Sequence, residues 1–302
     1  MKPAPFTYHR ARSAEDAVRL LAQLGEEAKV IAGGQSLVPM MSFRLARPEH
    51  LVDITAIKEL RYLQRDNNGL HIGALCTHHD VERADGVLEG YEVLRETMKW
   101  VGHLPIRTLG TVGGSMAHAD STAEWNLLAV LLNAVMVVEG PAGRREVPAE
   151  DFLFGLYMTA LEPDEILIEI RFPQPAPHAA VTEYAERAGD FAVVAAGVSL
   201  TMEGSRPQGG RIVLGGVAPA PLRVTAAEEI LQARSMAHDD RFQKCGEAAS
   251  HAVEEFFASG GEPDPHDISY RSSLAKRLVI EACRSALEKK SRAPLEQKGQ
   301  KQ

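Results

Sequence analysis

The sequence predicts an α+β protein with more than one domain. Its 302 residues exceed the length that a single compact core organises in most proteins. Strand-like and helix-like segments alternate along the first part of the chain, whereas the part after Pro173, Pro175 and Pro177 reads as antiparallel strands followed by helices. We therefore expect a domain boundary at these prolines, with residues 1–176 before it and 177–290 after it.

The N-terminal stretch predicts one helix and two short strands. Ser13 followed by Asp16 is typical of a helix start, and Gly25 is typical of a helix end. The apolar residues between these signals fall on one helical stripe. Strands are expected at residues 29–32 and 51–54, and an irregular or short helical segment at 37–45.

The middle of the chain predicts further strands and helices. The sequence Gly-Pro-Ala-Gly at residues 140–143 is typical of a hairpin turn. Residues 165–172 alternate apolar and polar side chains, which predicts a half-exposed strand. We expect strands at 70–75, 134–139, 144–147 and 165–172, and helices at 77–82, 91–101 and 121–132.

The part after the prolines predicts three strands and then three helices. We expect strands at 181–186, 191–202 and 211–217, a turn at 203–210, and helices at 225–234, 239–259 and 269–290. The last residues, 291–302, are mostly polar, which predicts a disordered tail.

Charge and hydropathy exclude several classes of partner. The net charge is -8, and residues 288–302 carry five basic and two acidic side chains, which leaves -11 on the rest of the chain. This acidity argues against binding to nucleic acid or to an anionic membrane. The longest apolar run, residues 127–138, is shorter than the roughly 20 residues of a membrane span, and the N-terminus has no signal-peptide pattern. We expect a cytoplasmic protein.

Metal chemistry on this chain is not expected. Cys76, Cys245 and Cys283 are far apart in sequence and cannot supply the four organised thiolates of an iron–sulfur cluster. His78 and His79 are adjacent, so on a helix they point about 100° apart and do not converge on one ion.

Two glycine-rich segments are the main functional signal. The first glycine segment is residues 31–37, Ile-Ala-Gly-Gly-Gln-Ser-Leu, and the second is residues 110–115, Gly-Thr-Val-Gly-Gly-Ser. Neither has the spacing of a Rossmann or a Walker motif. Such segments can present backbone N–H groups to phosphate, and glycine is expected at Gly33 and Gly113 because a Cβ would block that approach. Spacing alone favours a plain strand-to-helix turn for the first segment over a phosphate site.

Three polar residues follow the second segment. Asp120 is either the N-cap of the next helix or, like Glu124, an acceptor for ribose hydroxyls. His118 is either structural or a contact to a phosphate or a ring edge. The sequence contains no Gly-x-Ser-x-Gly motif, so it gives no indication of a hydrolase nucleophile.

Three motifs in order resemble one known family. They are residues 32–37 with Pro48 and 51–54, residues 106–107 with 110–115 and 117–120, and residues 188–192. Together they resemble the FAD-binding medium subunit of the molybdenum hydroxylase family, of the carbon monoxide dehydrogenase and xanthine dehydrogenase type. The chain departs from the family pattern at Thr108, Ser121 and Phe191, where relatives often have Asn, Pro and Tyr.

The resemblance implies a fold and a set of contacts. The fold would be a vanillyl-alcohol-oxidase (PCMH)-type FAD-binding domain of two α+β subdomains, about 1–56 and 57–176, followed by a small domain with a three-stranded antiparallel sheet and helices. No catalytic residue or metal ligand is implied. The implied FAD contacts are Ile31, Ala32, Gly33, Gly34, Gln35, Ser36, Leu37, Ile106, Gly110, Thr111, Gly113, Gly114, Ser115, Ala117, His118, Asp120, Glu124, Ile166 and Phe191.

The resemblance also implies partners. Two [2Fe-2S] clusters would lie on a small iron–sulfur subunit, and a molybdenum–pterin cofactor would lie on a large subunit where substrate is oxidised. This chain would pass electrons from the clusters through FAD to an acceptor, in a dimer of heterotrimers (a heterohexamer). Two other hypotheses stay open: a self-sufficient FAD oxidase or reductase on the same fold, and a non-catalytic nucleotide-binding assembly subunit.

Overall fold

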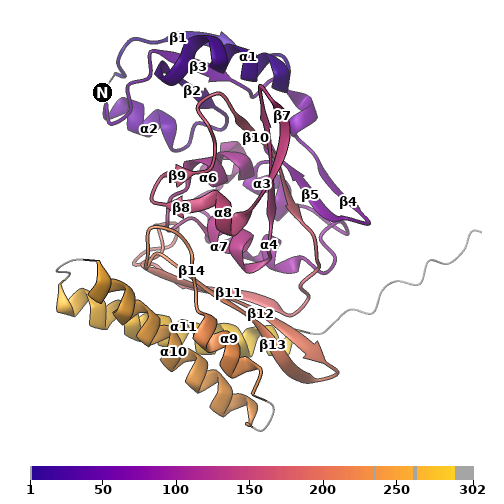
Figure 1. The fold of residues 1–302 in the computed structure, drawn as a ribbon, viewed down its shortest axis with the longest axis vertical. Helices are drawn as coiled ribbons and strands as arrows, with labels where there is room; N and C mark the ends of the chain where they lie inside the picture. The colour runs from indigo at the N-terminus through magenta and orange to yellow at the C-terminus, as the bar shows by residue number, and fades with distance from the viewer. Residues whose placement is uncertain (1, 234–235, 261–263, 290–302) are drawn as a thin grey trace, which may run out of the picture.

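The computed structural model describes residues 2–233, 236–260 and 264–289. They form three layers that are stacked along the long axis of the molecule (Figure 1). Each layer contains its own β-sheet, and the three sheets follow one another in the order of the chain. The mixture of sheets and helices confirms the α+β fold class predicted from the sequence. The predicted tail at 291–302 lies outside the described residues.

The upper layer is a three-stranded parallel sheet with the order β1-β3-β2. Its helix α1 begins where Ser13 Oγ accepts from the Asp16 backbone N–H at 3.1 Å, and ends at Gly25 with φ 66°, as predicted. The first strand has no counterpart in the prediction. The elements are β1 (Thr7–Arg10), α1 (Ala14–Leu24), η1 (Gly25–Glu27), β2 (Ala28–Ile31), α2 (Leu37–Ser42) and β3 (His50–Asp53).

The middle layer is a five-stranded antiparallel sheet with the order β4-β5-β10-β6-β7, flanked by short helices. A separate two-stranded hairpin, β8–β9, lies beside it. The elements are η2 (Lys58–Leu60), β4 (Leu63–Asp66), β5 (Gly69–Gly73), α3 (His78–Glu82), α4 (Glu92–Thr97), α5 (Leu104–Leu109), α6 (Val112–His118), α7 (Glu124–Leu131), β6 (Val135–Gly140), β7 (Gly143–Pro148), α8 (Ala149–Phe152), β8 (Leu153–Gly155), β9 (Met158–Thr159) and β10 (Ile166–Phe172).

Two predictions for this layer are wrong. The strand at β10 was expected to be half-exposed, but most of its side chains are buried. Ile166 and Ile168 join the core beneath α1, and Leu167 joins the core on the other face, so helices cover this central strand on both sides. The second glycine segment was expected to be a turn, but most of it forms the start of α6, which Thr111 caps.

The lower layer is an antiparallel sheet with the order β11-β12-β13-β14. The expected turn at 203–210 is much shorter, because β13 begins at Arg206, and a two-residue fourth strand joins the three predicted ones. The elements are β11 (Ala179–Tyr184), β12 (Val194–Glu203), β13 (Arg206–Gly215), β14 (Leu222–Arg223), α9 (Thr225–Leu231), α10 (His238–Ser259) and α11 (Pro265–Glu288).

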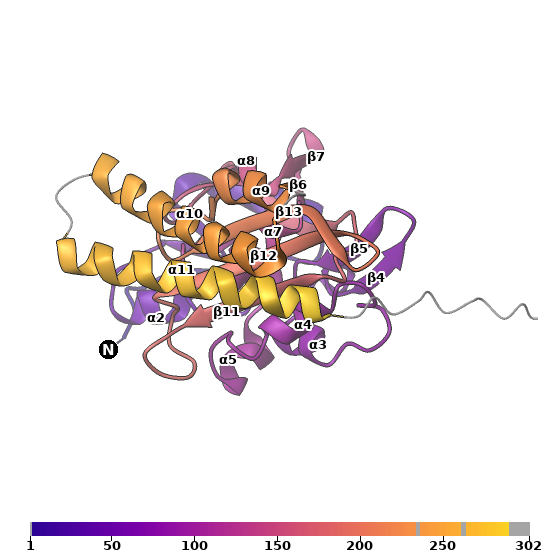
Figure 2. The ribbon, with the colours of Figure 1, turned by 90° about the horizontal axis from the view of Figure 1, so that it is seen from below.

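The lower sheet is packed on both faces. The long helices α10 and α11 lie side by side across one face (Figure 2). Helix α7 packs on the other face so closely that a Cβ on Gly197 would lie 2.7 Å from Leu127 Cδ2. This helix therefore lies in a single core that the middle sheet shares with one face of the lower sheet. Among the described helices, none combines the length and the apolar character that crossing a bilayer requires.

Candidate functional site

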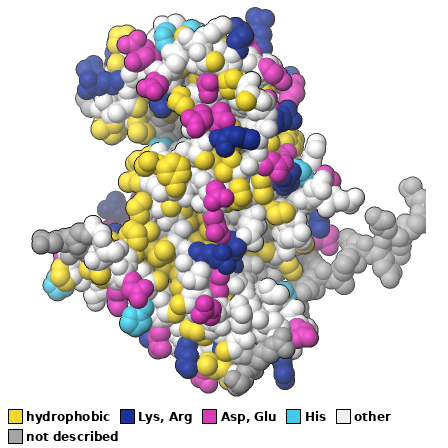
Figure 3. All heavy atoms as spheres, in the orientation of Figure 1, with side chains coloured by type: hydrophobic (Ala, Val, Ile, Leu, Met, Phe, Trp, Pro, Cys, Tyr) yellow, Lys and Arg dark blue, Asp and Glu magenta, His cyan; other side chains and the backbone are white. Residues whose placement is uncertain are grey.

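An open cavity lies between the layers and has about 1650 Å³ of empty space, counting its mouth. A hollow is visible between the upper and middle layers in Figure 3. Every residue that the family resemblance implied as a cofactor contact lines this cavity, although those residues come from loops and helices spread over the chain from Ile31 to Phe191. The fold therefore brings the three motifs to one place.

Several lining residues were missed from the sequence. Gly189 and Asp190 belong to the third motif, and His78 was considered only as a metal ligand. The others come from separate elements and carry no local signal, because only tertiary packing brings them to the cavity. The missed residues are Val30, Ile54, Ala74, His78, Val101, Gly102, Ala123, Leu161, Glu165, Leu167, Gly189 and Asp190.

The two glycine segments touch each other. A Cβ on Gly33 would lie 2.1 Å from Leu109 O and 2.8 Å from Gly110 Cα. A Cβ on Gly113 would lie 2.5 Å from the Ala74 Cβ. The sequence interpretation placed a phosphate against these glycines, but the close neighbours are protein atoms. Glycine at these positions is therefore explained by packing within the chain itself.

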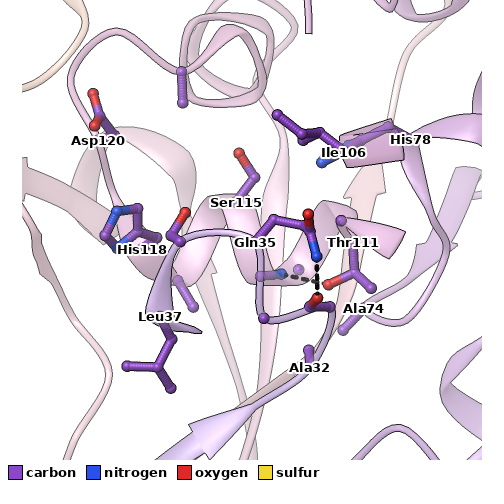
Figure 4. A pocket seen from close by; sticks show the side chains of 18 of the residues that line it. Ala32, Gln35, Leu37, Ala74, His78, Ile106, Thr111, Ser115, His118 and Asp120 are labelled. Carbon is purple, nitrogen blue, oxygen red and sulfur yellow. Dashed lines mark hydrogen bonds between the residues drawn. The ribbon is translucent and has the colours of Figure 1, made fainter. Parts of the chain in front are cut away.

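The first glycine segment leaves its backbone donors free. It follows the C-terminal end of parallel strand β2, a position where open sheets of this kind bind ligands. Gly34 has φ 69°, a left-handed conformation that favours glycine. Within the described chain, the backbone N–H groups of residues 33–36 have no acceptor. The Gln35 side chain donates from Nε2 to Gly33 O at 2.8 Å and so braces the segment (Figure 4).

The second glycine segment uses most of its backbone donors internally. The backbone N–H groups of residues 112–114 donate, in that order, to Cys76 O at 2.8 Å, Ala74 O at 3.0 Å and Thr111 Oγ1 at 3.1 Å. The last of these bonds is drawn in Figure 4. The expectation of bare N–H groups is therefore wrong for residues 112–114 of this segment, whereas the Thr111 N–H has no acceptor within the described chain. Its contribution to the cavity is a wall of small side chains, with the Ser115 hydroxyl lining it.

Asp120 is held by protein groups. It is not the N-cap of α7, because that cap is Ala123. Its Oδ1 accepts from the Thr122 backbone N–H at 2.9 Å and from the Thr122 hydroxyl at 2.7 Å, and its Oδ2 accepts from the Tyr157 hydroxyl at 3.3 Å. Burial lowers the pKa of the neighbouring His118, so this imidazole is neutral at pH 7.

Two carboxyl groups near α7 lie where the ionised form is disfavoured. Burial, and to a lesser extent the charge of Asp120, raise the pKa of Glu124 to about 7. Burial and the nearby Glu124 raise the pKa of Glu183 on β11 to about 8, although Lys99 opposes this shift. Glu183 Oε2 is buried without a hydrogen-bond partner in the described chain. At neutral pH this pair therefore holds protons that ordinary carboxyl groups would have released.

Glu165 is the contrasting case. Arg145 Nε donates to Glu165 Oε1 at 2.7 Å, and this ion pair lowers the pKa of Glu165. Glu165 therefore lines the cavity as a neutralised carboxylate, whereas Glu124 lines it as a proton-bearing group near pH 7.

His78 faces the cavity from the start of α3. Its backbone N–H donates to Gly110 O at 3.1 Å, which ties α3 to the second glycine segment. Its Nδ1 accepts from Trp125 Nε1–H at 2.9 Å. Burial, with the charge of Arg107, lowers the pKa of His78 to about 4. No group of three or more His, Cys, Asp or Glu among the described residues is arranged to hold a metal ion.

Two protein-family models match this chain. Residues 4–175 match the FAD binding domain in molybdopterin dehydrogenase. Residues 179–286 match the CO dehydrogenase flavoprotein C-terminal domain.

Individual relatives match over nearly the whole chain. A subunit of the 6-hydroxypseudooxynicotine dehydrogenase complex of Paenarthrobacter nicotinovorans is 35% identical, with 96% of this chain and 97% of the relative covered. The carbon monoxide dehydrogenase medium chain of Hydrogenophaga pseudoflava is also 35% identical, with 95% and 98% covered. A solved structure of carbon monoxide dehydrogenase from that organism superposes with a TM-score of 0.87 at 36% identity, covering 95% of this chain and 98% of that chain.

These matches confirm the resemblance seen in the sequence. The first family model spans more than half of the chain, and the second spans most of the remainder. The chain belongs to the family of FAD-binding medium subunits of molybdenum hydroxylases of the carbon monoxide dehydrogenase type.

Proposed function

We propose that this chain binds FAD in the cavity beside its two glycine segments and passes electrons through it within a multi-subunit molybdenum hydroxylase or dehydrogenase. The observation that carries the proposal is the free set of backbone donors at residues 33–36 on the cavity wall. Four consecutive N–H groups suit the oxygens of a diphosphate, which is the central group of FAD. The residues that the family resemblance implied as FAD contacts are proposed to be its contacts here.

The rest of the cavity fits the remaining parts of FAD. Glu124 offers carboxyl oxygens that suit ribose hydroxyls. Ile106 and Phe191 offer apolar surface for the flavin ring, and Phe191 is 73% exposed, so it is free to pack on a ring. When bound, FAD supplies the capacity to take up and release electrons. The chain's own residues bind it, orient it and limit the access of water.

Two of the cavity carboxylates are already occupied by protein groups. Asp120 is hydrogen-bonded to Thr122 and Tyr157, and Glu165 is paired with Arg145. The assignment of substrate oxidation to another chain is therefore proposed from the family resemblance. The two relatives at 35% identity are named for nicotine-derived and carbon monoxide substrates, so we propose no substrate for the complex.

The partners are proposed from the family resemblance, and the cysteines of this chain agree with that division. The three cysteines are fewer than the four thiolates of a [2Fe-2S] cluster, and all three are buried, so the clusters are assigned to a small partner chain. The family resemblance also implies a large partner chain that holds the molybdenum–pterin cofactor, and a dimer of heterotrimers. Exposed apolar side chains from the α2 end and the β8–β9 hairpin flank the hollow in Figure 3 and suit association. These are Phe43, Leu45, Phe154, Leu156 and Met158.

The role of the first glycine segment predicts a selective loss of FAD affinity. In Gly34→Ala, the left-handed conformation at φ 69° would cost about 1–2 kcal/mol. The variant loop relaxes without ligand and must recover the conformation on binding, so we expect FAD binding about tenfold weaker. Fluorescence titration with FAD measures the dissociation constant of each variant.

Gly86→Ala is the matched control for this experiment. Gly86 has φ 73°, open space around its Cα, and no place in the cavity lining. Alanine at this position has a similar conformational cost, but the variant should keep the FAD affinity of the wild type. Equal FAD affinity in the two variants would show that the first segment does not hold the cofactor.

The raised pKa of Glu124 predicts that replacing this residue with glutamine stabilises the chain at high pH but not at low pH. Because the folded chain holds this proton more tightly than the unfolded chain, the free energy of unfolding falls as pH rises from about 4.5 to about 7. Glu124→Gln removes that penalty, so the FAD-free chain should gain about 1–3 kcal/mol at pH 8 and almost nothing at pH 4.5. Thermal melting at the two pH values measures the difference.

Glu165→Gln is the control, with the opposite sign. The pKa of Glu165 is lowered by Arg145, so this variant should lose stability at pH 8. A Glu124→Gln variant with the same stability change at both pH values would contradict the assigned protonation.

The assembly is tested by isolating the tagged full chain from its source cells. We expect two further chains, one small and one large, with the absorbance of both flavin and iron–sulfur clusters. A lone chain that binds FAD and oxidises a substrate by itself would support the self-sufficient enzyme instead. A lone chain that binds ADP as tightly as FAD would support the nucleotide-binding assembly subunit.

A further inference from the structure

We propose that His78 donates a hydrogen bond from its Nε2–H to bound FAD, and that Trp125 is a positioning residue that fixes His78 in the required tautomer. The inference rests on the proposed FAD function, which it deepens by adding a polar contact that the glycine motifs do not contain. It is carried by the hydrogen bond between the two side chains and by the place of His78 on the cavity wall.

Trp125 determines which nitrogen of His78 carries the proton. The indole Nε1–H is a donor only, so the His78 Nδ1 at 2.9 Å must be the acceptor. A neutral imidazole that accepts at Nδ1 carries its proton at Nε2. The Trp125 side chain is fully buried at 0% exposure, so it has no water to bond instead. The pair is therefore a fixed arrangement.

The Nε2–H group of His78 is directed toward the second glycine segment. A Cβ on Gly110 would lie 2.9 Å from His78 Nε2, so only glycine leaves this nitrogen uncovered. His78 and Gly110 both line the cavity. Within the described chain, no acceptor is bonded to Nε2, and this nitrogen is not one of the buried polar atoms that lack a partner, so it is open to the cavity although His78 as a whole is only 4% exposed. A fixed donor that reaches the cavity is available to an acceptor on the ligand.

The groups around His78 keep it uncharged. Burial disfavours the charged imidazolium, and the positive charge of Arg107 on α5 acts in the same direction. The charge of Arg107 is itself held by Glu82, which also accepts from His79. His78 therefore acts as a neutral donor over the physiological pH range. The matching acceptor on FAD is a ring carbonyl or nitrogen, or an oxygen of the diphosphate.

The test compares His78→Leu with His78→Gln in the full chain. Leucine removes both polar atoms, whereas glutamine can accept from Trp125 and still donate into the cavity. We expect FAD binding about five- to fiftyfold weaker in the leucine variant and within about threefold of wild type in the glutamine variant. FMN and ADP are titrated alongside, and the fragment whose affinity falls shows whether the acceptor lies on the ring or on the diphosphate.

The tautomer is read directly from histidine nitrogen resonances of the ¹⁵N-labelled chain. We expect His78 protonated at Nε2 in the wild type, and a mixture of tautomers in Trp125→Phe. FAD should shift the Nε2–H resonance. If His78→Leu fails to fold, this shift still tests whether His78 contacts FAD.

Several results would overturn the inference. They are a proton on Nδ1 in the wild type, an Nε2–H resonance that FAD leaves unmoved, or a folded His78→Leu variant that binds FAD, FMN and ADP like the wild type. A wild-type chain that binds no FAD would refute the proposed function and this inference together, whereas the former results refute only the inference.

Discussion

The direct contact between the two glycine segments is the constraint on which the cavity depends. Gly33 lies against the backbone of Leu109 and Gly110, with no space for a side chain. This contact joins the upper parallel sheet to the helices of the middle layer, and the cavity opens beside it. The same glycines that resemble a cofactor motif are therefore also the packing surface between two layers.

The two segments contribute different things to one site. The first segment keeps four backbone N–H groups without acceptors, and the second has its first helical N–H groups bonded within the chain. The hydrogen bonds of the second segment hold α6 rigid, so it serves as a wall against which the first segment is braced. Charge is divided in a similar way, because Glu165 is neutralised by Arg145 while Glu124 lies near Glu183 and retains its proton.

Much of this arrangement could be predicted from the sequence. Helix α1 follows from local signals, since Ser13 and Gly25 act where the pattern places them. The family and the fold class follow from three motifs in order. The exposure of β10 and the bond from Tyr157 to Asp120 could not be predicted, because each depends on elements distant in sequence. The helical state of the second segment was missed because Gly113 and Gly114 are poor helix formers, although Thr111 caps the helix locally. The domain boundary near residue 176 and the individual FAD contacts stay predictions.

Amide hydrogen exchange of the full chain, with and without FAD, tests the central claim most directly. Without FAD, the amides of residues 33–36 should exchange fast and those of 112–114 slowly, because only the latter have acceptors in the chain. Added FAD should slow residues 33–36 strongly and change 112–114 little. Protection gained at 112–114, with none at 33–36, would contradict the division of roles between the two segments.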